Sequence, residues 1–252
     1  MLACTFYFHD RELIFSMVPS DTVTRILDAA EVLFAEHGFS ETSLRRITGR
    51  AEVNLAAVNY HFGSKQALIQ AVFFRYLDPF SADLNARLDA LETHEAGPAD
   101  LEGLLDTLFA SVLEMPSESH DLRTFMKLLG LAYSQTQRHL RDELGKRYGN
   151  IFSRFLKLLR QATPELADDE RFWRLHFMLG SVIFTLSGLN TLRDIAEHDY
   201  HQRITIRELA QRLKPVALHA LRAPVTDIGS ASVPGYHSDV DVTHHARTGT
   251  HS

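Results

Sequence analysis

Cysteine is almost absent from this sequence, since only Cys4 among the 252 residues carries a thiol. A single cysteine cannot form a disulfide framework within one chain and cannot build a cysteine-based metal site. This usage is typical of proteins in a reducing compartment. We therefore expect a cytoplasmic protein that needs no metal or other cofactor.

Long hydrophobic runs are missing as well. The longest stretch without a charged residue, 175–192, is shorter than a typical membrane-spanning helix and contains several polar side chains. Residues 1–16 are also apolar, but the sequence HDRE at 9–12 interrupts them, unlike the unbroken core of a secretory signal. We expect no membrane partner, and we interpret 1–16 as a disordered extension or as sequence upstream of a true start at Met17.

Familiar catalytic motifs are absent too. The sequence has no nucleophile elbow, no His-Glu-x-x-His zinc motif and no glycine-rich loop of the kind that binds phosphates. Without these motifs or a usable cysteine, we expect that the protein is not an enzyme.

Basic residues are in the minority. The chain has 26 Lys and Arg against 32 Asp and Glu, which gives a formal net charge of -6. An acidic chain does not attract nucleic acid as a whole, so any affinity for DNA must come from a local patch. The 45% content of hydrophobic residues is enough for a sizeable buried core.

Apolar residues recur at steps of three and four along most of the chain, and no segment alternates as a half-buried strand does. This pattern predicts an all-α fold. A proline inside the last span predicts a kink or split there, and the polar, Pro- and Gly-rich residues 223–252 predict a disordered tail. The predicted helices span about 21–37, 43–50, 55–60, 65–78, 80–94, 99–115, 120–161 with a break near 134–139, 168–196 and 204–222.

A short helix, a turn of about four residues and a second short helix follow one another between 43 and 60. This is the arrangement of a DNA-binding helix-turn-helix, whose second helix enters the major groove. In the second helix, LAAVNY, the small Ala56 and Ala57 allow a close approach to DNA. The amides of Asn54 and Asn59 can pair with bases or phosphates.

Polar and basic groups suited to phosphate contact flank this motif. Between residues 42 and 65 we count four Arg or Lys against one Glu, so the local charge is opposite to that of the whole chain. Phosphate contacts supply affinity and register, whereas base contacts supply sequence preference. The candidates for phosphate contact are Thr42, Ser43, Arg45, Arg46, Tyr60, His61 and Lys65.

The run TSLRRITGRAEVNLAAVNYHFGSKQALIQAVF resembles the helix-turn-helix of TetR-type regulators, with the family hallmark Tyr60-His61-Phe62-Gly63-Ser64-Lys65. The resemblance covers about residues 21–77. It implies an N-terminal three-helix DNA-binding domain at 17–70 and a C-terminal helical ligand-binding and dimerisation domain at 71–222. It also implies a homodimer on double-stranded operator DNA, with phosphates near the hallmark and Thr42 and Ser43, and base edges near Asn54, Ala56, Ala57 and Asn59.

One residue departs from the family pattern. The turn between the two helices usually contains glycine, where this chain has Glu52. A non-glycine residue in a left-handed conformation costs on the order of 1 kcal/mol, and a carboxylate near phosphates is unfavourable. We therefore expect either a differently shaped turn or weaker DNA binding.

Three segments resemble fatty-acid-responsive members of the family, namely VNLAAVNYHFGSKQALIQAVF, MKLLGLAYSQTQRHLR and FWRLHFMLGSVIFTLSGLNTLR. This resemblance implies a regulator, mainly a repressor, of lipid-metabolism genes that a long-chain fatty acid or acyl-CoA releases from DNA. A different small apolar effector and a ligand carrier that does not bind DNA are the alternatives. Candidate effector contacts, each of which can equally be plain core, are Phe109, Phe125, Met126, Leu129, Tyr133, Phe152, Phe155, Phe177 and Met178, with Arg123 and Arg174 for the head group.

The helix expected over 168–196 is apolar on more than one face and contains small residues that permit close helix packing. In the family, the last two helices of each subunit form the dimer interface. A twofold dimer predicts a palindromic operator with half-sites roughly 34–36 Å apart, or a multiple of that distance. The interface candidates are Trp173, Phe177, Gly180, Ser181, Phe184, Gly188, Leu209, Leu213 and Val216.

Overall fold

The computed structural model describes residues 21–93, 100–115, 122–135 and 137–225. The expected extension 1–16, the start at Met17 and all but 223–225 of the expected tail lie outside these residues. The chain divides into two compact units, Met1–Arg222 and Ala223–Ser252, and every described helix belongs to the first.

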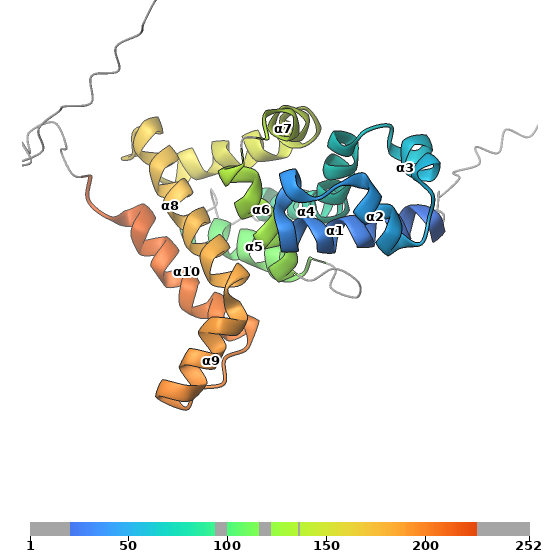
Figure 1. Ribbon diagram of the computed structural model, residues 1–252. Helices are drawn as coiled ribbons and strands as arrows, with labels where there is room; N and C mark the ends of the chain where they lie inside the picture. Colours follow the sequence, from blue (N-terminus) through green and yellow to red (C-terminus); the bar gives the residue numbers. More distant parts are fainter. Residues whose placement is uncertain (1–20, 94–99, 116–121, 136, 226–252) are drawn as a thin grey trace, which may run out of the picture. The chain divides into compact units, whose positions relative to one another are not determined.

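The described residues form helices and no strand, as the sequence predicts (Figure 1). Short connections join most neighbouring helices, and the break expected near 134–139 lies between the sixth and seventh. The helices are α1 (Asp21–Glu41), α2 (Leu44–Ala51), α3 (Leu55–Phe62), α4 (Lys65–Thr93), α5 (Leu101–Leu113), α6 (Leu122–Ser134), α7 (Arg138–Ala162), α8 (Asp168–Ser187), α9 (Leu189–Tyr200) and α10 (Ile206–Arg222).

The expected end of the first helix at Gly38 takes the form of a kink. Gly38 has φ 81°, which side chains rarely tolerate, and α1 resumes for one short turn to Glu41. A Cβ atom at Gly38 would lie only 2.6 Å from Nε2 of Gln135, just after α6. Oε1 of Gln135 accepts a hydrogen bond from the Phe39 amide at 3.1 Å. Glycine here therefore permits both the kink and a direct contact between α1 and the end of α6.

Helix α4 is one continuous helix through Pro79, so the prediction of two helices, 65–78 and 80–94, is wrong. Proline removes one backbone hydrogen bond, but tertiary contacts hold both sides of the site. Just before it, Asp78 accepts hydrogen bonds from Arg147 at 2.9 and 2.8 Å and from the Tyr148 hydroxyl at 2.6 Å. Just after it, Phe80 is buried. The expected domain boundary between residues 70 and 71 lies within this helix.

The span predicted as one helix over 168–196 is two helices, because the chain bends by 72° at Gly188 between α8 and α9. A Cβ atom at Gly188 would lie 3.1 Å from the Phe184 carbonyl oxygen, so glycine suits the bend. By contrast, α10 stays one helix through Pro215, and the split expected there does not occur. No single described helix is long and apolar enough to cross a membrane, although the bent pair α8–α9 reaches that length and composition together.

The core is continuous from α1 to α6. Phe34 packs against Phe39, whose ring centre lies 6.2 Å from that of Phe73 on α4. Phe73 in turn contacts Phe125 of α6, and Phe125 stacks on Tyr76 with ring centres 4.7 Å apart. These rings are all buried, so packing connects the N-terminal helices with α6 through shared apolar surface.

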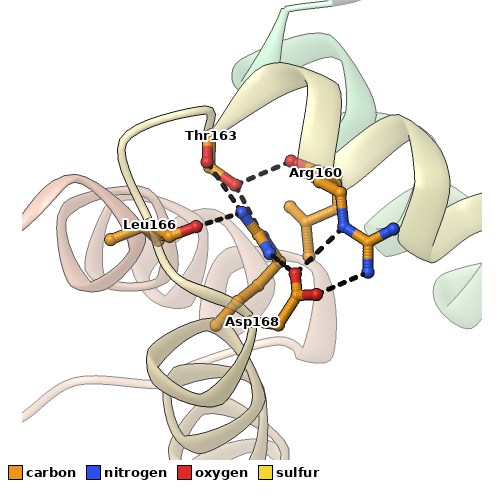
Figure 2. A network of polar contacts seen from close by, with 6 residues as sticks. Arg160, Thr163, Leu166 and Asp168 are labelled. Carbon is orange, nitrogen blue, oxygen red and sulfur yellow. Dashed lines mark hydrogen bonds and ion pairs between the residues drawn. The ribbon is translucent and has the colours of Figure 1, made fainter.

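A buried arginine organises the connection between α7 and α8 (Figure 2). Arg171 donates to the Thr163 hydroxyl at 3.0 Å and to the Thr163 carbonyl at 2.9 Å, and it also contacts Leu166 and Asp168. Arg160 donates two 3.0 Å bonds to the same Asp168. A buried charge of this kind is tolerated only when its donors are paired, as they are here.

Candidate nucleic-acid interface

The helix-turn-helix begins at side-chain caps. The Ser43 hydroxyl accepts from the Arg46 amide at 3.3 Å at the start of α2, and Oδ1 of Asn54 accepts from the Ala57 amide at 2.8 Å at the start of α3. These caps satisfy amides that would otherwise lack partners at the first turn of each helix. Ser43 is thus the N-cap of α2, and Asn54 is the N-cap of α3.

The prediction that Thr42 contacts a phosphate is wrong. Its side chain is 0% exposed, and its hydroxyl donates to the carbonyls of Gly38 at 2.8 Å and Leu33 at 3.0 Å. Such a hydroxyl is not available to a phosphate. Thr42 instead stabilises the passage from the kinked end of α1 to α2, a role that the sequence pattern does not distinguish from phosphate contact.

The turn between α2 and α3 has the left-handed conformation considered for it. Glu52 adopts φ 54° and ψ 44°, and its amide donates to the Thr48 carbonyl. The expectation of a differently shaped turn is therefore wrong. The Glu52 side chain is exposed.

Helix α3 is held by one buried residue and presents most of the rest to solvent. Val58 is fully buried, and Ala57 and Phe62 pack partly against the core. The remaining residues of the helix are exposed, with Tyr60 reaching 85%. Phe62 therefore helps to hold α3 against the core, whereas Tyr60 faces solvent. The exposed residues of α3 are Leu55, Ala56, Asn59, Tyr60 and His61.

Basic residues lie on the helices that come directly before and after α3 in the chain. Arg45, Arg46 and Arg50 are exposed on α2, and Arg46 lies 2.8 Å from Nε2 of His37. At the start of α4, the ammonium of Lys65 donates to the Ser40 carbonyl at 3.2 Å. Partial burial lowers the pKa of Lys65, and the nearby Glu41 opposes that shift. Cations on α2 and α4 therefore flank the uncharged α3.

The predicted effector contacts differ in their burial. Those on the inner faces of α6 and α7 are packed core, whereas others point outward. Among the described residues, a hollow of about 400 Å³ lies at Gln202, Arg203, Ile204, Glu208, Gln211 and Arg212, and it includes none of the predicted contacts. Phe125, Met126 and Phe155 are buried, Phe109, Leu129 and Met178 are half-buried, and Tyr133, Phe152 and Phe177 are exposed.

The prediction that Arg174 binds the head group of the effector is also wrong. Its guanidinium is buried, pairs with Glu170 at 2.7 Å and donates to the carbonyls of Ala220 at 3.0 Å and Leu221 at 3.2 Å. It therefore joins α8 to the end of α10, and it is not placed to meet a head group. Arg123, half-buried on α6, donates to Oδ1 of Asn190 at 2.6 Å.

The predicted interface residues mostly share one exposed surface of α8. Phe177 is 66% exposed, and Trp173 stacks beside it with ring centres 6.1 Å apart. Gly188, Leu209 and Leu213 are half-buried. We name the exposed set, Trp173, Phe177, Gly180, Ser181 and Phe184, the α8 face. Val216 of α10 is exposed as well.

Leu55 is an exposed apolar residue that is not among the predicted DNA contacts. It is 40% exposed at the start of α3. The available clue was its position as the first residue of the helix expected to enter the groove. Phe172, which is 50% exposed beside Trp173, lies on the helix predicted to form the dimer interface.

Comparison with known proteins agrees with this geometry. Residues 26–72 match the family described as bacterial regulatory proteins of the tetR family. Residues 106–220 match the family described as the tetracyclin repressor-like C-terminal domain. Together the two matches cover well over half of the chain.

Curated relatives match the N-terminal part. The chain is 30% identical over 87 residues to the probable HTH-type transcriptional regulator YttP of Bacillus subtilis, which is 34% of this chain and 42% of that protein. It is 40% identical over 81 residues to the HTH-type transcriptional repressor Rv3405c of Mycobacterium tuberculosis, which is 32% of this chain and 38% of that protein. The chain thus spans about two fifths of the length of these relatives. Their names describe regulators and not enzymes.

Solved structures share the fold. The fatty acid degradation regulator FadR from Bacillus halodurans is 19% identical, with a TM-score of 0.51 over 80% of this chain and 95% of that one. Mycobacterium smegmatis AmtR is 21% identical, with a TM-score of 0.51 over 80% of this chain and 86% of that one. From its helix-turn-helix, its all-helical fold and both domain matches, the chain belongs to the tetR family of bacterial regulatory proteins.

Proposed function

We propose that the protein is a ligand-responsive transcriptional regulator, mainly a repressor, that binds a palindromic operator as a homodimer. Residues 17–70 form its DNA-binding domain, and 71–222 form its effector and dimerisation domain. The observation that carries the proposal is the exposed surface of α3, held by the buried Val58 and flanked by cations on α2 and α4.

The proposed contacts follow from helix-turn-helix geometry. The first turn of α2 and the ends of α3 meet phosphates, and the N-terminal residues of α3 face base edges. The candidates for contact with base edges are Asn54, Ala56, Ala57 and Asn59. Ser43, Arg45, Arg46, Tyr60, His61 and Lys65 are the phosphate contacts.

The α8 face supports the homodimer. Exposed aromatics at this density are unusual on the surface of a monomer and need a partner. Gly180 and Ser181 lie between Phe177 and Phe184 on this face. Because a twofold axis places a residue against its own copy, small residues at the centre allow two α8 helices to approach closely. Val216, which is exposed, and the half-buried Gly188, Leu209 and Leu213 are the other candidates for this interface.

An acyl effector is the finer part of the proposal. It rests on the resemblance of three segments to the fatty-acid-responsive regulator PsrA and on the half-buried apolar residues Phe109, Leu129 and Met178. Arg123 is the head-group candidate. An effector that favours a dimer geometry unsuited to DNA weakens operator binding by the same factor by which DNA weakens effector binding.

The test is a titration of the full-length protein with DNA from its own upstream region, with and without oleate or oleoyl-CoA. We expect tight binding that falls on the order of 10³-fold between 50 and 200 mM salt. Arg45→Ala should lower the affinity and reduce the salt slope by about one. The exposed Arg203 near the end of α9 gives a matched control, Arg203→Ala, which should change neither.

Each outcome selects a function. Release by the acyl ligand supports the whole proposal. Tight binding that ignores acyl ligands keeps the regulator and requires a different effector. Absence of binding to upstream DNA at low salt would favour a ligand carrier that retains the fold.

A further inference from the structure

The surface of α3 that faces solvent carries no formal charge. Leu55–Phe62 has the sequence LAAVNYHF, with no Arg, Lys, Asp or Glu. Leu55 and Asn59 are one turn apart and both exposed, while Val58 is buried on the other side of the helix. The N-terminal residues of a recognition helix contact base edges, so this chain faces the bases with an alkyl group and an amide.

Leu55 is 40% exposed at the very first position of α3. An apolar side chain at this position can contact only one apolar group in the major groove, the C5 methyl of thymine. Ala56 beside it is small enough to let the Leu55 side chain and the helix backbone approach the groove. Leu55 is therefore suited to recognise thymine.

Asn54 and Asn59 are not equivalent. The Asn54 oxygen accepts from the Ala57 amide as the cap of α3, so the orientation of this side chain is already fixed by the helix. Asn59 is exposed, and among the described residues its side chain has no hydrogen-bond partner. Asparagine pairs with adenine through its side-chain amide: the oxygen accepts from N6, and the nitrogen donates to N7.

The commonest specific contact to guanine needs Arg or Lys, and the cations near α3 lie on other elements. Arg45 and Arg46 belong to α2, and Lys65 contacts the Ser40 carbonyl. We propose that Leu55 and Asn59 are the specificity-determining residues and that each half-site presents thymine to Leu55 and adenine to Asn59. This inference rests on the proposed operator binding.

The experiment begins by selecting duplexes from a randomised library with the full-length protein. In the selected sequence, each thymine of the half-site is then replaced by deoxyuridine, which removes the methyl group and keeps every hydrogen-bonding group. We expect an affinity loss of about fourfold per half-site, the value of one buried methyl group, and about 15-fold for both.

Two variants test the assignment. Leu55→Ala should bind the thymine and deoxyuridine duplexes equally, and Asn59→Ala should lose at least about fivefold of its preference for adenine. Leu156→Ala is the matched control, because Leu156 is 44% exposed but lies on α7. This control should keep the wild-type difference between the two duplexes. Circular dichroism establishes that each variant is folded.

Three outcomes overturn the inference. A selected half-site in which guanine and cytosine face α3, or wild-type affinity that ignores the methyl groups, would refute it and leave the regulator intact. If the protein prefers cytosine and Glu52→Gln abolishes this preference, the base specificity comes from Glu52 in the turn and not from α3. Failure of the folded protein to enrich any DNA at low salt would remove the proposed function together with the inference.

Discussion

Glu52 occupies a backbone conformation that favours glycine, at a position next to the proposed DNA surface. Two separate costs follow. The left-handed conformation is strained for a residue with a Cβ atom, and the exposed carboxylate repels phosphates.

Glu52→Gly should therefore stabilise the protein by up to about 1 kcal/mol and tighten DNA binding. Glu52→Gln separates the two effects, since it removes the charge and keeps the strain. Denaturant unfolding and DNA titration measure them. Lower stability of the glycine variant would show that contacts of the Glu52 side chain outweigh the strain of its left-handed conformation.

Arg171 presents the opposite case, a charge that the interior needs. Arg171→Ala would leave the Thr163 carbonyl and hydroxyl without their buried partner. We expect a loss of about 1–3 kcal/mol in the free energy of unfolding, the cost of leaving a buried polar group without its partner. The exposed Arg160 contacts the same Asp168, so Arg160→Ala is the control and should cost no more than about 1 kcal/mol. Equal losses in the two variants would contradict the structural role of Arg171.

At the scale of helices, local chemistry made the N-terminal region predictable. The caps at Ser43, Asn54 and Ser64 act within three residues of themselves, so the sequence alone is enough to place α2, α3 and the start of α4. The exposed face of α3 followed from the same local pattern.

Longer-range contacts decided the features that sequence reasoning missed. Pro79 does not end α4 because residues from α7, 69 and 70 positions away, bind Asp78. Arg174 was assigned to a ligand, but it binds carbonyls near the end of α10, 46 and 47 positions away. The burial of Thr42 depends on the kink at Gly38, and the local pattern that predicts phosphate contact for Thr42 does not show this burial. None of these partners can be deduced from spacing along one helix.

The contact between α1 and the end of α6 gives a prediction at this scale. Gln135→Ala removes the acceptor of the Phe39 amide, so this amide should exchange with solvent faster, and stability should fall by about 1 kcal/mol. Hydrogen exchange at Phe39 is the measurement. Gln161→Ala, at an exposed position of α7, is the control. Unchanged exchange at Phe39 would mean that the kink at Gly38 alone protects this amide.

For the whole molecule, the α8 face determines the expected assembly. Phe177→Arg places a charge in the proposed interface, where Phe177 is highly exposed in the single chain. We expect a folded monomer by sedimentation and an operator affinity reduced at least tenfold, since only one half-site can then be bound at a time. Leu156→Arg on α7 should remain dimeric. A dimer that survives Phe177→Arg would exclude this surface.

The unbroken course of α4 has a mechanical consequence. Its 29 residues form a rod of roughly 43 Å, whose first turn adjoins α3 and whose later turns are held by ion pairs such as Arg154–Asp89. A tilt of about 5° at the far end moves the near end by roughly 3.5 Å, close to the rise of a single base pair. In the proposed homodimer, a tilt of this size in each subunit would move the two α3 helices, one from each subunit, out of register with the DNA without any helix unfolding.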